Sequence, residues 1–245
     1  EALIAAGVKR VIAAIRDPFS MVRGRGFRRL HAAGIDATAG LLADEARRLN
    51  APYLKLQKQG RPWVILKWAQ SIDGKIATRT GDSQWISSPA SRQYAHRIRG
   101  RVDAVVVGVG TAIQDDPLLT CRYGRVRRVA SRIVLDPQLR MSCRLKLIAN
   151  ADRAPTIVVT DRSLVTESWA GRLRRYGVEI LGLPRTRTGL DLAMLLDELG
   201  RRRMTNIMIE GGGRTLGSFF DAGLADEVVV FVSPRLIGGE GAPSA

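Results

Sequence analysis

The feature that most constrains the fold is an alternation of short apolar runs with amphipathic segments, which begins at Pro62. The apolar runs are rich in β-branched residues and read WVILKWAQ, DAVVVGVG, RIVLD, TIVVT, VEILGL, NIMIE and EVVVFVSPRLI. Helical patterns lie between several of them, namely SPASRQYAHRIRGR, SWAGRLRRYG and LDLAMLLDELGRR. Strands that are apolar along their whole length and alternate with helices indicate an α/β fold, a mostly parallel sheet with helices on both faces. Ligands are then expected at the carboxyl ends of the strands.

The first fifty residues have a different organisation. LIAAGVKRVIAAIRDP contains the end of a helix and a β-rich run, and GRGFRRLHAAGIDATAG adds a short helix and another strand. These residues are interpreted as the end of an α/β unit. Because the first residue is Glu1 rather than Met, the sequence is interpreted as a piece of a longer chain. A charged helix and a polar connection in LADEARRLNAPYLKLQKQGRP predict a domain boundary near residues 50–60.

Composition narrows the class of protein. A chain of 245 residues with 45% hydrophobic content is sufficient for a sizeable core, and it lacks the run of about eighteen apolar residues that a membrane span needs. Two cysteines, Cys121 and Cys143, exclude a disulfide framework and fit a reducing cytosol, so a cytoplasmic location is expected. His31 and His96 lie far from both cysteines, so no local zinc cluster is predicted and both histidines are expected to be structural.

The net charge of +16 raises the alternative of a basic nucleic-acid-binding fragment. Arginines cluster in RGRGFRR, HRIRGR, RYGRVRR and RRR. However, only 5% of the residues are aromatic, and none of these clusters interleaves aromatic residues in the way that favours base stacking. A solvated, arginine-rich surface is therefore favoured over a nucleic-acid partner, and an anionic small substrate would need only a few of these arginines.

Three polar or glycine-rich turns follow predicted strands, at residues 67–73, 108–116 and 210–217. VGVGTAI lacks the third small residue of a dinucleotide-binding fingerprint because Ile113 takes its place, and DGKIAT has Ile76 where a P-loop needs Ser or Thr. NIMIEGGGRTLGSFF combines a strand, Glu210, three glycines and a helical segment, a turn that exposes backbone N–H groups to an anion. Together the three turns predict a cleft for a cofactor and a substrate.

Residues 66–122, LKWAQSIDGK through DDPLLTCR, resemble the reductase domain of the bifunctional riboflavin-biosynthesis deaminase/reductases, as does IEGGGRTLGSFFDAGLADEVVVFVSPRLIGG. DGK, SQWI, DDPLLTCR and EGG are the motifs that carry this resemblance. It implies a dihydrofolate-reductase-like NADPH-dependent domain in residues 60–245, truncated before the family's last strands. Residues 1–50 are similar to the tail of the family's zinc-dependent, cytidine-deaminase-like domain. The zinc motifs would lie before Glu1, so zinc belongs to the missing part of a parent chain and no metal site is expected here.

The resemblance implies reduction of 5-amino-6-(5-phosphoribosylamino)uracil, whose ring-opened ribosyl group accepts hydride at C1′ and becomes a ribityl chain. Lys67 is expected to polarise or protonate the substrate, Glu210 to bind the pyrimidine or the ribose hydroxyls, and Asp116 is a weaker third catalytic candidate. A parent chain would also deaminate the 2,5-diaminopyrimidine precursor. The remaining alternative is a reductase of the same fold with a pterin-like substrate, although the arginine of DDPLLTCR favours a phosphorylated ligand.

The resemblance also implies a set of binding residues. The cofactor site is expected to comprise Ala69, Trp85, Thr111, Asp115, Gly211, Gly212, Gly213, Arg214, Thr215, Leu216, Gly217 and Ser218. The substrate site is expected to comprise Ser83, Arg99, Leu119, Arg122 and Glu210. Arg99 and Arg122 are expected to hold the phosphate of a phosphorylated pyrimidine through charge-assisted hydrogen bonds. Arg162 is a weaker candidate for the cofactor 2′-phosphate, and a homo-oligomer is expected.

Overall fold

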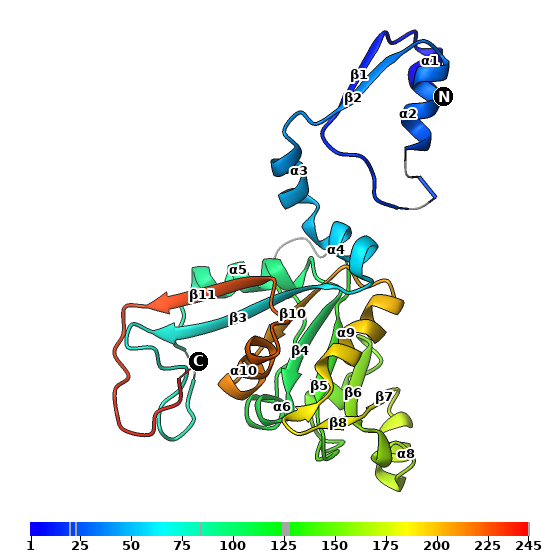
Figure 1. Ribbon diagram of the computed structural model, residues 1–245. Coiled ribbons are helices and arrows are strands. Elements are labelled where there is room, and N and C mark those ends of the chain that lie inside the picture. The colour runs from blue at the N-terminus through cyan, green and yellow to red at the C-terminus, as the bar shows by residue number, and fades with distance from the viewer. Residues whose placement is uncertain (20, 23, 84, 124–127, 245) are drawn as a thin grey trace. The chain divides into compact units, whose positions relative to one another are not determined.

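The computed structural model describes residues 1–19, 21–22, 24–83, 85–123 and 128–244. The chain divides into two compact units, Glu1–Arg61 and Pro62–Ala245 (Figure 1). Gln84 of the SQWI motif and three arginines of the basic clusters, Arg23, Arg125 and Arg127, lie outside the described residues.

The first unit is a short alternation of helices and strands, as the sequence predicts. Its two strands are parallel and pair from Arg10 with Asp36 to Ala13 with Ala39. The polar connection expected near residues 50–60 is wrong, because this segment is a helix; Pro52 lies in its first turn, where a missing N–H costs no helical hydrogen bond. The elements are α1 (Ala2–Ala5), β1 (Arg10–Ala13), α2 (Arg25–Ala32), β2 (Asp36–Ala39), α3 (Ala43–Leu49) and α4 (Ala51–Gln59).

The second unit is built on a parallel sheet. Within the described residues the sheet has seven strands in the order β11-β3-β10-β4-β5-β6-β7, and every neighbouring pair is parallel. Each apolar run of the sequence supplies one strand, so the predicted α/β fold is confirmed. The strands are β3 (Trp63–Ser71), β4 (Ala104–Gly108), β5 (Ser131–Leu135), β6 (Thr156–Asp161), β7 (Glu179–Leu183), β10 (Asn206–Glu210) and β11 (Glu227–Ser233), with a separate antiparallel pair β8 (Arg185–Thr186) and β9 (Gly189–Leu190).

Helices cover both faces of this sheet (Figure 1). Successive strand residues point to opposite faces, so each apolar strand contributes to two cores. Val105 of β4 lies in one apolar cluster with Leu173 of α8, whereas the next residue, Val106, lies in a second cluster with Leu195 of α9 and Phe219 of α10. The helical elements are α5 (Pro89–Arg99), α6 (Val109–Asp115), α7 (Lys146–Ala149), the 3-10 turn η1 (Arg162–Leu164), α8 (Ser168–Arg174), α9 (Leu192–Arg201) and α10 (Gly213–Asp221).

The strand order brings distant segments of the chain together. β10 lies between β3 and β4, and its last residue, Glu210, pairs with Lys67 of β3. The expectation that Lys67 ends a strand is wrong, because β3 continues to Ser71, where it still pairs with β11. Side chains at paired positions of parallel strands point to the same face, so Lys67 and Glu210 lie side by side. In parallel sheets, ligands bind where the strand order reverses in this way.

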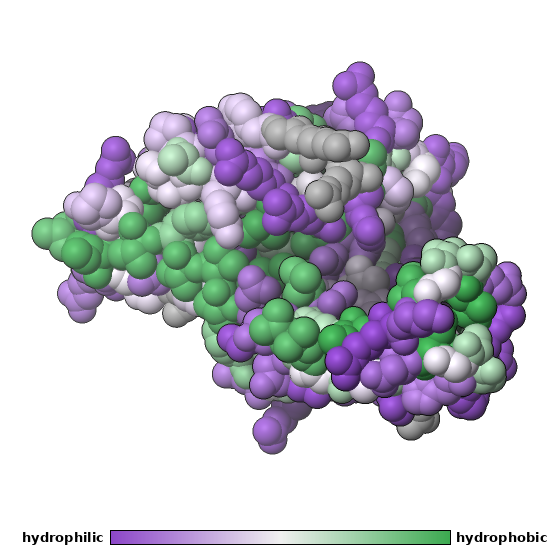
Figure 2. All heavy atoms as spheres, turned by 90° about the horizontal axis from the view of Figure 1, so that it is seen from above, coloured by the Kyte–Doolittle hydropathy of each residue, from purple (hydrophilic) through white to green (hydrophobic). Residues whose placement is uncertain are grey.

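Strand β11 forms one edge of the sheet and exposes apolar side chains. Val228, Val230 and Val232 alternate along it, and all three are exposed. Figure 2 shows hydrophobic residues gathered along this part of the surface. None of the helices in the described part of the chain has the length and apolar character that a membrane crossing requires.

Candidate active site

A cleft of about 780 Å³ opens at the ends of β10 and β4, beside the later residues of β3. It brings together residues that are far apart in the sequence, including every predicted catalytic and substrate residue. These are Lys67, Ser83, Arg99, Asp116, Leu119, Arg122 and Glu210. Their arrangement in one cleft is a structural finding, whereas their individual roles stay predictions.

The predicted cofactor residues divide into two groups. Those that line the cleft are Ala69, Trp85, Thr111, Asp115, Gly211, Gly212 and Gly213. Those that do not line it are Arg214, Thr215, Leu216, Gly217 and Ser218, which form the first turns of α10. Leu216 is buried in the apolar core, and Arg162 begins the turn after β6, away from the cleft lining.

Helix α5 supplies three polar side chains to the cleft, Arg92, His96 and Arg99. It begins as the sequence predicts, with Pro89 in the first turn and the Ser88 hydroxyl accepting a hydrogen bond from the Ser91 N–H at 3.2 Å. His96 and Arg99 lie three residues apart near its end, so they share one face of the helix.

Arg99 forms a buried, two-point ion pair with Glu210. Its Nε donates to Oε1 at 2.6 Å and its Nη2 donates to Oε2 at 2.7 Å. Burial alone would raise the pKa of Glu210, but the charge and hydrogen bonds of Arg99, together with the Lys67 charge, lower that pKa to about 2. Glu210 is therefore an ionised carboxylate at neutral pH, and it is not a proton donor in this cleft.

Lys67 completes this ion cluster. Its Nζ lies 3.8 Å from Oε2 of Glu210 and 5.7 Å from the centre of the Phe231 ring. The carboxylate and the ring face hold the ammonium group in place, and 16% of the Lys67 side chain remains exposed. The ammonium is thus positioned to interact with a bound ligand.

The glycine turn after β10 packs closely against the start of α6. Gly211 has a φ of +118°, and a Cβ at this position would lie 2.7 Å from Oγ1 of Thr111. The same Thr111 oxygen accepts a hydrogen bond from the Gly212 N–H at 3.2 Å. Gly212 caps α10 without a side chain, so the free N–H groups at the start of this helix form a site suited to an anion.

The loop after α6 has two residues in the left-handed backbone region, Asp116 (φ 40°) and Leu119 (φ 53°). The Asp116 carboxylate accepts the Lys146 N–H at 2.7 Å and lies 3.3 Å from the Lys146 ammonium. Leu119 is buried in the core. This geometry favours an anchoring role for Asp116 over proton transfer, and strained backbone of this kind is concentrated at functional sites.

His96 is a cleft residue that the sequence analysis did not identify. Its Nδ1 accepts a hydrogen bond from the Arg122 N–H at 3.2 Å. Burial, followed by the positive charges of Arg99 and Arg122, lowers the pKa of His96 from 6.5 to about 4, against an opposing effect of Glu210. The ring is therefore neutral at neutral pH. The spacing of His96 and Arg99 on one predicted helix was the available signal.

The loop after β3 forms one wall of the cleft. The Arg92 guanidinium lies 4.4 Å from the centre of the Trp85 ring, and the Trp85 carbonyl accepts a hydrogen bond from Arg235 at 3.0 Å. The Asp73 carboxylate accepts the Gly238 N–H at 2.8 Å. The segment after β11 thus holds this wall in place. Among the described residues, no three His, Cys, Asp or Glu side chains form a group suited to a metal ion.

The fold and the cleft define an α/β domain with a ligand site at the switch point of a parallel sheet. The family described as the RibD C-terminal domain matches residues 62–245, so the chain belongs to this family. This confirms the resemblance to the riboflavin-biosynthesis enzymes that the motifs indicate.

Similar proteins are longer than this chain. The riboflavin biosynthesis protein RibD of Aquifex aeolicus is 41% identical over 238 residues, which cover 97% of this chain and 65% of that protein. The structure of Acinetobacter baumannii RibD (form 1) is 31% identical with a TM-score of 0.84, covering 99% of this chain and 65% of its own. A third relative is the structure from Thermotoga maritima of a diaminohydroxyphosphoribosylaminopyrimidine deaminase/5-amino-6-(5-phosphoribosylamino)uracil reductase. It is 30% identical with a TM-score of 0.83, and the match covers 99% of this chain and 64% of that chain. The chain thus spans slightly less than two thirds of these relatives.

Proposed function

We propose that the chain carries a reductase domain that uses NADPH to reduce 5-amino-6-(5-phosphoribosylamino)uracil in riboflavin biosynthesis. The observation that carries this proposal is the buried cluster of Lys67, Glu210 and Arg99 beside a glycine turn in one cleft. Family membership and the reductase activity named for the Thermotoga maritima relative support it. In this proposal residues 60–245 form the reductase domain and residues 1–50 are a remnant of a deaminase domain. A longer parent chain would also have deaminase activity. The proposal further includes a homo-oligomer and a cytoplasmic location.

The cleft fits a nicotinamide dinucleotide. The free N–H groups at the start of α10, after Gly211 and Gly212, suit a phosphate, and the close approach of Thr111 leaves no space for a side chain at Gly211. Ala69 and Trp85 would line the remainder of the cofactor site. When bound, NADPH supplies a hydride to C1′ of the substrate.

The structure suggests different tasks for the two arginines that the sequence assigns to the substrate phosphate. Arg99 already donates two hydrogen bonds to Glu210, so its charge is compensated within the protein. Among the described residues, no carboxylate forms an ion pair with Arg122, which lies on the cleft wall. Arg122 is therefore the phosphate ligand in our proposal, and Arg99 orients Glu210.

The reaction needs a proton as well as a hydride. The C1′–N double bond of the ring-opened substrate takes up hydride at carbon and a proton at nitrogen, which leaves the single bond of the ribitylamino product. Lys67 is the proposed proton donor, since its ammonium lies in the cleft and is held by Glu210 at 3.8 Å. Each Glu210 oxygen has a further lone pair with which to accept a hydrogen bond from a ribose hydroxyl.

Loss of nicotinamide absorbance tests the proposal directly. The chain should oxidise NADPH when 5-amino-6-(5-phosphoribosylamino)uracil is supplied and should not do so with dihydrofolate. Equal turnover of dihydrofolate would support the pterin-like alternative instead. Salt-sensitive binding to random-sequence DNA that NADPH does not affect, without any reductase activity, would support a nucleic-acid-binding fragment.

A further inference from the structure

His96 joins two parts of the cleft that are far apart in the sequence. It lies on the last turns of α5, is only 6% exposed, and accepts the Arg122 N–H through Nδ1. A backbone N–H is always a donor, so Nδ1 must be unprotonated. The Tyr123 ring also contacts the imidazole edge-on, with 5.1 Å between the ring centres, and this contact restricts the plane of the imidazole.

The loop that presents Arg122 is anchored at three points. Asp116 binds the start of α7 through the Lys146 N–H, and Leu119 is buried in the core. The third anchor is the hydrogen bond from Arg122 to His96. The first two anchors lie several residues before Arg122, so the third is the one that, in the described part of the chain, holds the backbone at the arginine itself.

We propose that His96 is a positioning residue, which fixes the backbone of Arg122 so that the Arg122 guanidinium meets the phosphate of the substrate. The inference rests on the proposed function, because it takes the substrate to be a phosphorylated pyrimidine. A neutral imidazole suits this place better than a cationic side chain, since Arg99 and Arg122 already lie beside it. A histidine that only filled space in the core would have no particular effect on a phosphate.

The matched variants are His96→Asn and His96→Leu. Asn places an oxygen acceptor close to the position of Nδ1, whereas Leu has nearly the same shape and no acceptor. One neutral hydrogen bond contributes about 1 kcal/mol, or about a fivefold change in affinity. His96→Leu should therefore weaken binding of ribose 5-phosphate about fivefold, measured by calorimetry. His96→Asn should stay within about twofold of the unmodified chain.

Kinetics and a double variant separate positioning from a general effect on folding. His96→Leu should raise KM for the phosphorylated substrate more than it lowers kcat, and it should leave the dephosphorylated analogue unaffected. In the Arg122→Ala background, His96→Leu should have no further effect on ribose 5-phosphate binding. Thermal unfolding of each variant verifies that it is folded.

Three results would overturn the inference while the proposed function stands. The first is an unmodified chain that turns over NADPH but does not bind ribose 5-phosphate. The second is a His96→Leu variant that loses affinity equally for the phosphorylated and the dephosphorylated compounds. The third is a His96→Asn variant that binds ribose 5-phosphate as weakly as His96→Leu does. Absence of NADPH turnover by the unmodified chain, with ribose 5-phosphate binding intact, would instead contradict the proposed function. The two failures are thus distinguishable.

Discussion

The ion pair between Glu210 and Arg99 is the feature whose removal should be most costly to the reductase unit. Glu210→Gln keeps the shape of the side chain and removes its charge. The Arg99 guanidinium, with only 15% of its side chain exposed, then loses its counter-charge. Removing one partner of a buried ion pair typically costs about 3–5 kcal/mol, because the other charge stays buried without compensation.

The pKa of Glu210 gives an independent magnitude. Its ordinary value is 4.5 and its value in the folded protein is about 2. At about 1.4 kcal/mol for each pKa unit, the ionised carboxylate contributes about 3–4 kcal/mol to the free energy of unfolding. Because the folded pKa is the lower one, this contribution is complete above the unfolded value of 4.5 and is lost as the pH falls towards about 2.

Urea unfolding, followed by tryptophan fluorescence, measures both the magnitude and its pH dependence. At neutral pH, Glu210→Gln should be less stable than the unmodified chain by about 3–4 kcal/mol. At about pH 3.5 the difference should shrink to about 2 kcal/mol.

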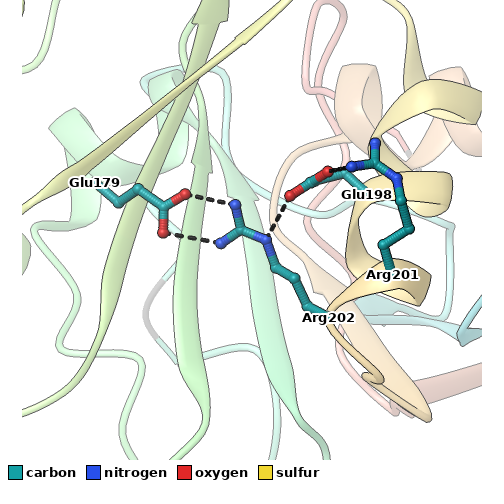
Figure 3. A network of polar contacts seen from close by, with 4 residues as sticks. All are labelled: Glu179, Glu198, Arg201 and Arg202. Atoms are coloured by element: carbon teal, nitrogen blue, oxygen red, sulfur yellow. Dashed lines mark hydrogen bonds and ion pairs between the residues drawn. The ribbon is translucent and has the colours of Figure 1, made fainter.

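A matched control comes from the surface of the same unit. Glu179 of β7 also binds an arginine at two points, since it accepts from Nη1 of Arg202 at 2.8 Å and from Nη2 at 2.5 Å (Figure 3). However, 47% of the Glu179 side chain is exposed, and Arg202 keeps a second partner in Glu198. Glu179→Gln should therefore cost at most about 1 kcal/mol.

Two results would contradict this prediction: equal destabilisation by Glu210→Gln and Glu179→Gln, or a loss of stability in Glu210→Gln that is the same at neutral pH and at about pH 3.5. Either result would mean that burial does not strengthen the pair of Glu210 and Arg99. A loss of activity without a loss of stability would likewise place the importance of this pair in substrate binding alone.

Three further predictions concern single side chains. Lys67→Met should lower kcat at least about a hundredfold while changing NADPH affinity little, since general acid catalysis contributes about that much; unchanged kcat would exclude Lys67 as proton donor. Gly211→Ala should cost about 1–3 kcal/mol and weaken NADPH binding because of its positive φ, whereas Gly212→Ala, with ordinary contacts, should be much milder in both urea unfolding and cofactor titration. Arg132→Met should cost about 2 kcal/mol or more in urea unfolding, because a fully buried guanidinium donates to three oxygens that would lose their donor; equal stability would contradict this.

Much of the fold could be predicted because the sheet is parallel and buried on both faces. Strands in such a sheet are continuous apolar runs, so NIMIE and TIVVT identify β10 and β6 without knowledge of their neighbours. Helix α6 was missed since it begins at Val109, directly after the last strand residue, with no polar boundary between them. The α4 helix was missed because its polar composition is equally typical of a connection.

The site could be predicted only as a set of residues and not as a geometry. Motifs place Lys67, Arg99 and Glu210 near the ends of separate segments, but their contact depends on the insertion of β10 between β3 and β4. No local pattern encodes that strand order. The pairing of Arg99 with Glu210, the last residue of β10, is a consequence of that order, and it changes the expected role of Arg99.

The net charge of the cleft lining is much smaller than the net charge of the whole chain. Among the described residues that line the cleft, five carry a positive charge and three carry a negative charge. The lining therefore has an excess of two positive charges, whereas the whole chain has an excess of sixteen. The charged lining residues are Lys67, Arg92, Arg99, Arg122, Lys146, Asp115, Asp116 and Glu210. An excess of two can offset the substrate phosphate, whereas the phosphates of the proposed cofactor would depend on the N–H groups at the start of α10. A nucleic-acid strand would require a longer positive surface. The described basic residues outside the cleft lining are therefore not required for contact with the substrate phosphate, and substituting such surface arginines should leave substrate affinity unchanged.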